Sequence, residues 1–328
     1  MPDFSDIVDT VIEVPVVSSF TRIGYAVRSR IDDWEDLDSY DLEGRTFVVT
    51  GSTSGLGRFA AHQLAARGAH VVLNGRSHDK TAGVRDEITA DTGSTEVSVA
   101  VADMGELDQV REMAGELTSR FDRIDGLLHN AGALSAERRE NSEGIEATIA
   151  SQVVGPFLLT SLLLDALRAA APGRVVTMSS GGMYTAGLTV SRLQMGEPQY
   201  GGSEQYARAK RAQVTLNEMW AERIPADEIV FQALHPGWAD TPGVEEALPT
   251  FRKVVGPLLR SSAEGADTMV WLAADDGEPV ATTGEFWLDR RTRSIHKLGS
   301  TRKTDTPERR AELWNWCVEQ SGADVEPW

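Results

Sequence analysis

Short apolar runs alternate with longer amphipathic stretches along most of the chain, beginning near residue 45. Apolar runs bounded by turn residues predict buried strands, and the stretches between them predict helices. The predicted strands are 46–50, 71–74, 96–101, 124–129, 174–178, 228–234 and 284–288. This alternation predicts an α/β protein, a doubly wound Rossmann fold with a seven-stranded, mainly parallel sheet covered on both faces.

The pattern also divides the chain into one large domain with two extensions. We expect an N-terminal arm at 1–43, a Rossmann-fold domain at 44–298 and a C-terminal helical tail at 299–328. In the tail, the sequence Thr-Pro-Glu at 306–308 is typical of a capped helix start and leads into apolar residues. A chain of 328 residues is long enough to bury a large core.

A glycine-rich segment separates the first predicted strand from the first helix. It carries Gly51, Gly55 and Gly57, follows an apolar run and precedes a stretch suited to a packed helix. Glycines let the backbone approach a pyrophosphate closely, and the helix N-terminus offers unpaired N–H groups to the anion. The segment therefore favours a dinucleotide site over the alternative, an ordinary strand–helix loop.

Tyr206 and Lys210 lie four residues apart in a predicted helix and so share one of its faces. An ammonium group near a phenol is expected to lower the phenol pKa from its usual value of about 10. Such a pair suits general acid/base chemistry between an alcohol and a carbonyl. The alternative is a solvated helix face.

Several polar or turn residues stand at or just after predicted strands: Thr50, Asp103, Asn130, Ser180 and Pro236. The carboxyl ends of parallel strands meet at one edge of a sheet, where ligands bind. We therefore expect these residues to converge on one crevice.

The glycine spacing and the Tyr206–Lys210 pair together resemble the short-chain dehydrogenase/reductase family. The sequence His-Asn-Ala-Gly at 129–132 stands where the family carries Asn-Asn-Ala-Gly, and Pro236-Gly237 follows the sixth predicted strand. The resemblance covers roughly residues 45–298. It implies reversible hydride transfer between a nicotinamide cofactor and a carbonyl or alcohol, in which the protein orients the reactants and moves the proton.

The resemblance also implies roles for individual residues. Tyr206 is the expected acid/base, Lys210 its partner and ribose ligand, and Ser180 the group that stabilises the substrate oxygen, with Ser179 as the alternative. Gln152 stands where the family usually has an asparagine in a water-linked proton relay, and its side chain is one methylene longer. The implied cofactor-binding residues are Gly51, Ser52, Thr53, Ser54, Gly55, Leu56, Gly57, Arg76, Asp103, Met104, Asn130, Ala131, Gly132, Tyr206, Lys210, Pro236, Gly237 and Thr241.

The end of the second predicted strand bears on the choice of cofactor. Gly75 stands where NAD-preferring relatives usually carry a carboxylate, and Arg76 follows it. A guanidinium can bind a 2′-phosphate through a bidentate contact. We therefore expect NADP(H) in preference to NAD(H); the alternative is that Arg76 stacks on adenine or points to solvent.

Apolar residues between Ser180 and Tyr206, and after Pro236-Gly237, suggest a hydrophobic pocket and a lipophilic carbonyl or alcohol substrate. The alternative is that these residues only pack the loops that carry them. They are Met183, Tyr184, Leu188, Leu193, Met195, Tyr200, Trp238, Val244, Leu248 and Phe251.

The net charge and the cysteine and histidine content limit which partners and metal sites are expected. A formal net charge of −18 argues against nucleic acids and anionic membrane surfaces as main partners. The single cysteine, Cys317, is expected to be a buried thiol in a reducing, cytoplasmic setting. The six histidines lack metal-ligand spacing, so no metal site is expected.

The region 11–34 is apolar for its place in the chain but also carries arginines. It could contact a membrane interface peripherally, since no run is long enough to span a bilayer. Because acidic residues surround it, we favour packing on its own domain or on a subunit neighbour in a homo-oligomer.

Two other functions remain open at this point. The first is a catalytically weak or inactive nucleotide-binding scaffold or sensor, which Gln152 and the unusual arms leave possible. The second is a sugar-nucleotide epimerase or dehydratase, which would need a sizeable C-terminal substrate domain. Only about forty residues follow the seventh predicted strand, too few for such a domain.

Overall fold

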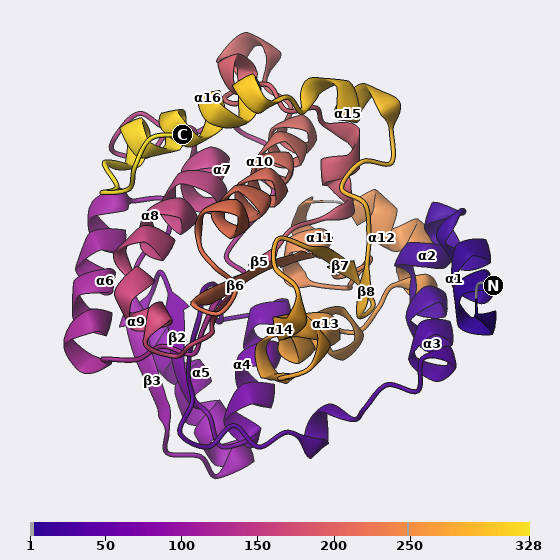
Figure 1. The fold of residues 1–328 in the computed structure, drawn as a ribbon, viewed down its shortest axis with the longest axis vertical. Coiled ribbons are helices and arrows are strands. Elements are labelled where there is room, and N and C mark those ends of the chain that lie inside the picture. Colours follow the sequence, from indigo (N-terminus) through magenta and orange to yellow (C-terminus); the bar gives the residue numbers. More distant parts are fainter. Residues whose placement is uncertain (1–2, 248) are drawn as a thin grey trace.

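One twisted sheet, seen near the centre of Figure 1, organises the computed structural model, which describes residues 3–247 and 249–328. The strand order is β3-β2-β1-β4-β5-β6-β7-β8. The strands are β1 Thr46–Val49, β2 His70–Gly75, β3 Val97–Val101, β4 Gly126–His129, β5 Gly173–Met178, β6 Ile229–Leu234, β7 Phe286–Leu288 and β8 Arg291–Thr292. Neighbouring strands from β3 to β7 pair in parallel, which confirms the doubly wound Rossmann fold.

The sheet has eight strands, so the predicted number of seven was wrong by one. The extra strand, β8, pairs antiparallel with β7 through a tight turn at Asp289 and Arg290. Both turn residues have positive φ, 56° and 53°. A strand of two residues is too short to give the alternating pattern by which strands are recognised in sequence.

Two helical layers cover the sheet because successive strand residues face opposite sides. Phe47 and Val49 pack with one layer, and Val48 packs with the other. The first layer contains α4 Gly55–Ala66, α5 His78–Thr92 and α13 Ser262–Ala274. The second contains α6 Leu107–Arg120, α8 Gly155–Leu162 and α10 Gly202–Arg223.

Shorter elements connect these layers and extend the chain at both ends. The arm contains α1 Phe4–Glu13, α2 Val16–Phe20 and α3 Arg22–Ile31, and the tail contains α15 Gly299–Thr304 and α16 Pro307–Ser321. The other helices are α7 Ala147–Ile149, α9 Leu164–Arg168, α11 Pro242–Ala247, α12 Pro249–Val255 and α14 Glu278–Ala281. The short helical turns are η1 Leu37–Ser39, η2 Ala150–Val154, η3 Gly181–Thr185, η4 Val190–Arg192, η5 Glu197–Gln199 and η6 Gly256–Leu258.

The N-terminal arm packs on its own domain through buried charges. Figure 1 shows its three indigo helices beside β8 and α12. Arg28, which is fully buried, pairs with Asp9 of the arm and Asp289 of the β7–β8 turn, both at 2.7 Å. Arg291 of β8 binds Asp32 in the same way. The apolar face of α1 is left exposed to solvent.

The C-terminal tail crosses α8 and α10 (Figure 1). Thr306 caps α16 by accepting the Arg309 N–H at 3.4 Å, which confirms the predicted helix start. Trp314 and Cys317 are buried in the core, and burial raises the pKa of the Cys317 thiol above its usual range. None of the helices in the described ranges combines the length and apolarity needed to cross a bilayer.

Candidate active site

The site is built where the parallel strands end. Arg76 and Asn130 directly follow β2 and β4, while Gly51, Asp103 and Ser180 stand two residues beyond β1, β3 and β5. All of these strands run in the same direction, so the residues share one edge of the sheet. The predicted convergence is therefore present in the fold.

Asn130 joins the glycine-rich segment to the loop after β4. Its backbone N–H donates to Thr50 Oγ1 at 3.0 Å, and its Nδ2 donates to the carbonyls of Thr50 at 3.0 Å and Gly51 at 3.1 Å. A Cβ at Gly57 would lie 2.3 Å from Asn130 Nδ2, and one at Gly51 would lie 2.7 Å from Ala131 Cα. Close packing therefore requires glycine at both positions, and Gly51 also has a φ of +63°.

The start of α4 fits a phosphate group. No side chain among the described residues caps this helix at Ser54, so its first N–H groups and the positive end of its dipole are available to an anion. Gly55 has a φ of +55°, and a Cβ built on it would lie 3.6 Å from Thr241 Cβ. Ser52 points inward instead, where its Oγ donates to the Asn74 carbonyl at 3.1 Å. These residues fit the pyrophosphate of a dinucleotide.

At the end of β2, the structure leaves no room for a side chain at Gly75. A Cβ there would lie 2.5 Å from Thr81 Oγ1 and 2.6 Å from Thr53 Cγ2. The next residue, Arg76, has a side chain that is 80% exposed and lies 3.9 Å from Asp103 Oδ2. A side chain at position 75 would require Thr53 and Thr81 to move, whereas the exposed guanidinium of Arg76 can reach a ligand beside it.

Met104 differs from the other predicted ligands because its side chain is buried in the core. Its carbonyl lies against the start of α8, only 1.9 Å from where a Cβ on Gly155 would be. Any contact of Met104 with a cofactor would therefore involve its backbone.

Ser180, Tyr206 and Lys210 come together around the η3 turn. The position of a Cβ on Gly182 lies 3.7 Å from Ser180 Oγ and 3.9 Å from Tyr206 Cδ1, so the two side chains flank the same space. Lys210 Nζ lies 5.2 Å from the centre of the Tyr206 ring. Ser179 is buried, and its Oγ donates to the Lys210 carbonyl at 3.2 Å. The geometry therefore places Ser180, and not Ser179, beside Tyr206.

The pKa of Tyr206 shifts in the direction opposite to the one we expected. Burial raises it to about 12, and an interaction with Ser180 opposes this rise. Lys210 sits over the ring, and its Nζ donates to the Met178 carbonyl at 2.9 Å. Burial lowers the pKa of Lys210 to about 7. In this state Tyr206 is a neutral phenol at physiological pH and can donate a proton.

The lowered pKa of Lys210 predicts a pH dependence of stability. An unfolded lysine has a pKa of about 10.4, so between about pH 7 and 10 the unfolded chain binds more protons than the folded one. The free energy of unfolding should therefore rise with pH in this window, by at most about 1.4 kcal/mol per pH unit from this residue. Urea denaturation of wild type and Lys210→Met at pH 7, 8 and 9 checks this. The wild type should show the steeper rise, and equal slopes would contradict the assignment.

Gln152 lies in η2, where the helix widens to the π form that often marks functional sites. Its side chain is fully buried beneath Gly132, and its Nε2 donates to the Ala133 carbonyl at 2.7 Å. A cavity of about 30 Å³ adjoins it, with His129 and Asn217 among its lining residues. Within the described ranges, Gln152 Oε1, His129 Nδ1 and Asn217 Oδ1 are buried without hydrogen-bond partners. A cavity of this size has room for one or two water molecules, which these unpartnered atoms could bind.

Two further residues shape the site and were missed from the sequence. His235 accepts the Gly181 N–H through Nδ1 at 3.1 Å, next to Ser180. Arg260 packs against Gly237, where a Cβ would lie 2.2 Å from the guanidinium carbon. Gly237 itself has a φ of +74°. His235 directly precedes the Pro-Gly pair and could have drawn attention, but Arg260 carries no local signal.

The apolar loop residues contribute less to a pocket than we expected. Met183, Leu188, Leu193 and Met195 are all buried, so the loop between Ser180 and Tyr206 folds into the core. For these residues the alternative, packing of the loop, is correct. Trp238 and Phe251 are half-buried and contact each other at 5.1 Å between ring centres, and Leu248 lies outside the described residues.

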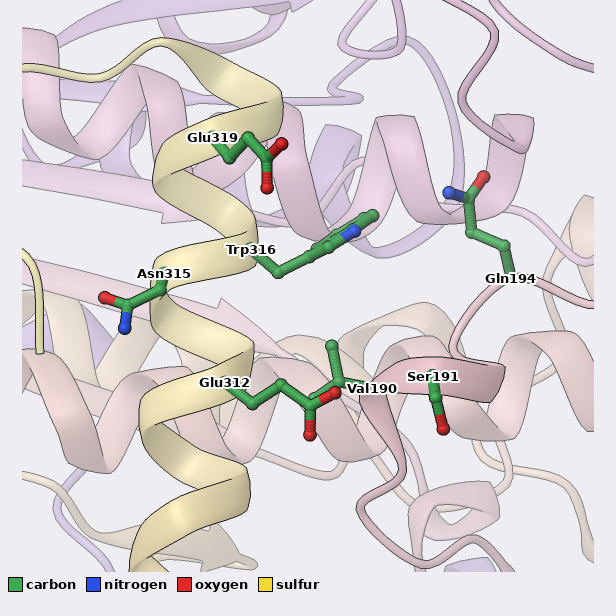
Figure 2. Close-up of a pocket in the computed structure, with 7 residues that line it drawn as sticks. All are labelled: Val190, Ser191, Gln194, Glu312, Asn315, Trp316 and Glu319. Atoms are coloured by element: carbon green, nitrogen blue, oxygen red, sulfur yellow. The ribbon is translucent and has the colours of Figure 1, made fainter.

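An open pocket of about 460 Å³ lies elsewhere, between α16 and η4. Figure 2 shows Trp316 extending from α16 toward the segment that carries Gln194, with Glu312 and Glu319 on the same helix. Its seven lining residues include none of the predicted site residues. The predicted site residues named above stand instead at the carboxyl ends of the strands.

The chain is similar in sequence to known proteins. A family described as short chain dehydrogenase matches residues 45–250. Dehydrogenase/reductase SDR family member 12 of Homo sapiens is 36% identical, with 84% of this chain and 86% of that protein covered. Retinol dehydrogenase 12 of Bos taurus is 30% identical, with 86% and 87% covered.

Solved structures of similar fold belong to the same family. A Shigella flexneri structure described as a short chain dehydrogenase complexed with NADP has a TM-score of 0.60 and 26% identity, covering 76% of this chain and 98% of that one. The family match spans more than half of the chain, and the relatives align over most of their length. The chain therefore belongs to the short chain dehydrogenase family.

Proposed function

We propose that this protein is an oxidoreductase that transfers a hydride between NADP(H) and a carbonyl or alcohol of a lipophilic substrate. The observation that carries the proposal is the meeting of Ser180 and Tyr206 around one space, at the sheet edge where α4 offers its uncapped N-terminus. The nicotinamide would supply the hydride chemistry. The chain's own residues would bind, orient and move the proton.

Tyr206 would act as the general acid in reduction and as the base in oxidation. Its raised pKa keeps the phenol protonated at neutral pH, which suits proton donation to a developing alkoxide. Ser180 would donate a hydrogen bond to the same oxygen and stabilise its charge. Lys210 would hold the ribose hydroxyls with Nζ, which already lies beside the tyrosine ring.

The remaining crevice residues would hold the cofactor. Gly51 to Gly57 would cradle the pyrophosphate, and Asp103 would lie beside the adenine. Asn130, Ala131 and Gly132 would line its middle, and Pro236, Gly237 and Thr241 would face the nicotinamide. The placement of Thr241 supports this, because a Cβ built on Gly55 would lie 3.6 Å from the Thr241 side chain, which puts Thr241 close to the glycine-rich segment.

A preference for NADP(H) is supported by the end of β2. Position 75 carries no carboxylate, a side chain there would press on Thr53 and Thr81, and the exposed Arg76 lies 3.9 Å from Asp103. An exposed pair of this kind is weak, so Arg76 could leave it for a 2′-phosphate at little cost. The alternative roles of Arg76, stacking on adenine or facing solvent, predict no change in cofactor preference when it is removed.

Replacing Arg76 by alanine should therefore weaken NADPH binding by about ten- to a hundredfold and leave NADH binding nearly unchanged. A hydrogen-bonded charge pair contributes about 1.5–3 kcal/mol, which corresponds to that loss. Fluorescence titration of both nucleotides measures it. Arg168→Ala is the matched control, because this half-exposed arginine pairs with Glu228, which directly precedes β6 and so lies at the opposite edge of the sheet. Equal losses for NADPH and NADH would contradict the assignment.

A lipophilic substrate is supported by Trp238 and Phe251, which are half-buried on the segment after the Pro-Gly turn. It is also supported by a relative whose name specifies retinol, a lipophilic alcohol. The buried cysteine suits a reducing compartment such as the cytoplasm. We also propose that the protein forms a homo-oligomer.

Gln152 favours a second candidate, a nucleotide-binding scaffold with little turnover. One of the two N–H groups of its Nε2 is taken by the Ala133 carbonyl, and its longer side chain would shift any water-linked proton path toward Lys210. The two candidates differ in one experiment, NADPH oxidation with a panel of lipophilic ketones and aldehydes. Turnover supports the oxidoreductase, whereas NADPH binding without turnover on the whole panel supports the scaffold.

A further inference from the structure

We propose that the N-terminal arm positions the active site. In this proposal Phe20 packs against the two turns that carry Ser180 and Pro236-Gly237 and so holds them in place. The inference rests on the proposed function for the roles of those turns. The structural evidence for it is a set of contacts that connect the arm to the two turns through two buried residues, His235 and Arg260.

Phe20, at the end of α2, is the arm residue nearest to the site. Its side chain is 4% exposed, and its ring meets the His235 ring edge to face at 4.3 Å between centres. A Cβ on Gly181 would lie 2.8 Å from Phe20 Cε2. The Phe20 carbonyl also accepts the Trp238 N–H at 2.7 Å. One arm residue therefore touches both turns.

His235 connects Phe20 to the turn that carries Ser180. Its Nδ1 accepts the Gly181 N–H at 3.1 Å, which requires a neutral imidazole with its proton on Nε2. Burial and neighbouring cations keep its pKa well below the usual value, so this state holds at neutral pH. Gly181 follows Ser180 directly, so the orientation of the His235 ring sets the path of the backbone beside the serine. Phe20 fixes that orientation by packing against the ring.

Arg260 makes the second connection. Its guanidinium donates to the carbonyls of Ser19 at 3.1 Å and Thr21 at 3.2 Å in the arm, and to that of Pro236 at 3.3 Å. It fills the space beside Gly237 that a side chain would otherwise take. The arm and the Pro-Gly turn are therefore bound to the same buried cation.

The glycine-rich segment does not share these contacts; its partners named above are Asn130, Ala131 and Thr241. Loosening the arm should thus misplace the reacting groups while leaving the phosphate cradle in place. A displacement of about 1 Å at reacting groups can cost about a hundredfold in rate. Phe20, His235 and Arg260 are positioning residues, and their effect should appear in kcat more than in cofactor affinity.

The test compares Phe20→Ala, Phe20→Leu and the control Phe4→Ala, which alters a 73% exposed residue of the same arm. Assays are run below the melting temperature of every variant. Phe20→Ala should lower kcat about ten- to a hundredfold with the NADPH Kd changed less than about threefold. Phe20→Leu should restore most of kcat by refilling the space, and Phe4→Ala should match wild type. A folded Phe20→Ala protein with wild-type kcat would overturn the proposal.

Amide hydrogen exchange gives a readout that needs no substrate. In Phe20→Ala, exchange should accelerate in the peptides that contain Gly181 and Trp238, because the acceptors of both N–H groups lose their support. Exchange in residues 51–57 should stay unchanged. Unchanged exchange at Gly181 and Trp238 would overturn the positioning role. If wild type proves inactive while exchange behaves as described, the proposed function fails and the structural role of the arm stands.

Discussion

Replacing Tyr206 by phenylalanine should lower turnover by about 10²–10⁴-fold while leaving NADPH binding within about twofold of wild type. The substitution removes only the hydroxyl that would exchange the proton with the substrate oxygen. The ring remains, so the packing of Lys210 Nζ over it at 5.2 Å is retained. Steady-state kinetics with a ketone from the panel and fluorescence titration of NADPH measure the two quantities.

Tyr40→Phe is the matched control for this substitution. It removes a tyrosine hydroxyl that donates to Asp275 at 2.7 Å, away from the strand-end crevice. Its kcat should remain close to that of wild type. If Tyr206→Phe kept wild-type turnover, or if Tyr40→Phe lost as much, Tyr206 would not be the acid/base.

Replacing Asp289 by alanine should lower the free energy of unfolding by about 3–5 kcal/mol, the cost of breaking a buried ion pair by removing one partner. Asp289 is 1% exposed and accepts from Arg28 at 2.7 Å and from Arg260 at 2.5 and 2.8 Å. Without the carboxylate, two buried guanidinium groups would face each other. Arg28 would keep Asp9 and Arg260 would keep its carbonyl acceptors, so the chain should still fold.

Urea denaturation at pH 7 measures the loss. Glu87→Ala is a suitable control because Glu87 and its partner Arg58 are both half-exposed. Exposed ion pairs contribute little to the free energy of unfolding. Its unfolding midpoint should stay close to that of wild type. A small effect for Asp289→Ala would mean that the arginines find other partners and that this cluster does not hold the arm.

The fold could be predicted from the sequence because each buried parallel strand leaves a continuous apolar run. Seven such runs fell on seven real strands, and the strand-end residues met at one edge. Strand starts shifted by up to two residues, as at β4 and β7, because the residue at which strand pairing begins is not marked in the sequence pattern. The missing strand, β8, depends on a turn with positive φ that sequence pattern does not reveal.

The candidate site was predictable where chemistry and local spacing coincide, as in the glycine-rich segment and the Tyr206–Lys210 pair. Properties set by distant packing were not. The raised pKa of Tyr206 comes from burial, and the place of Arg260 depends on an arm more than two hundred residues earlier. The loop after Ser180 is apolar for the same reason that strands are, and sequence alone could not separate pocket lining from core packing.

The most direct test is transfer of deuterium from NADPH that carries deuterium at both C4 positions of the nicotinamide to a lipophilic ketone or aldehyde by the purified wild-type protein. Mass spectrometry of the product reads the result. We expect one deuterium on the former carbonyl carbon for each NADPH oxidised, and a rate of transfer about 10²–10⁴-fold lower with Tyr206→Phe. Tight NADPH binding without transfer to any panel member would contradict the proposed chemistry. A protein that binds neither NADPH nor NADH would contradict the dinucleotide site itself.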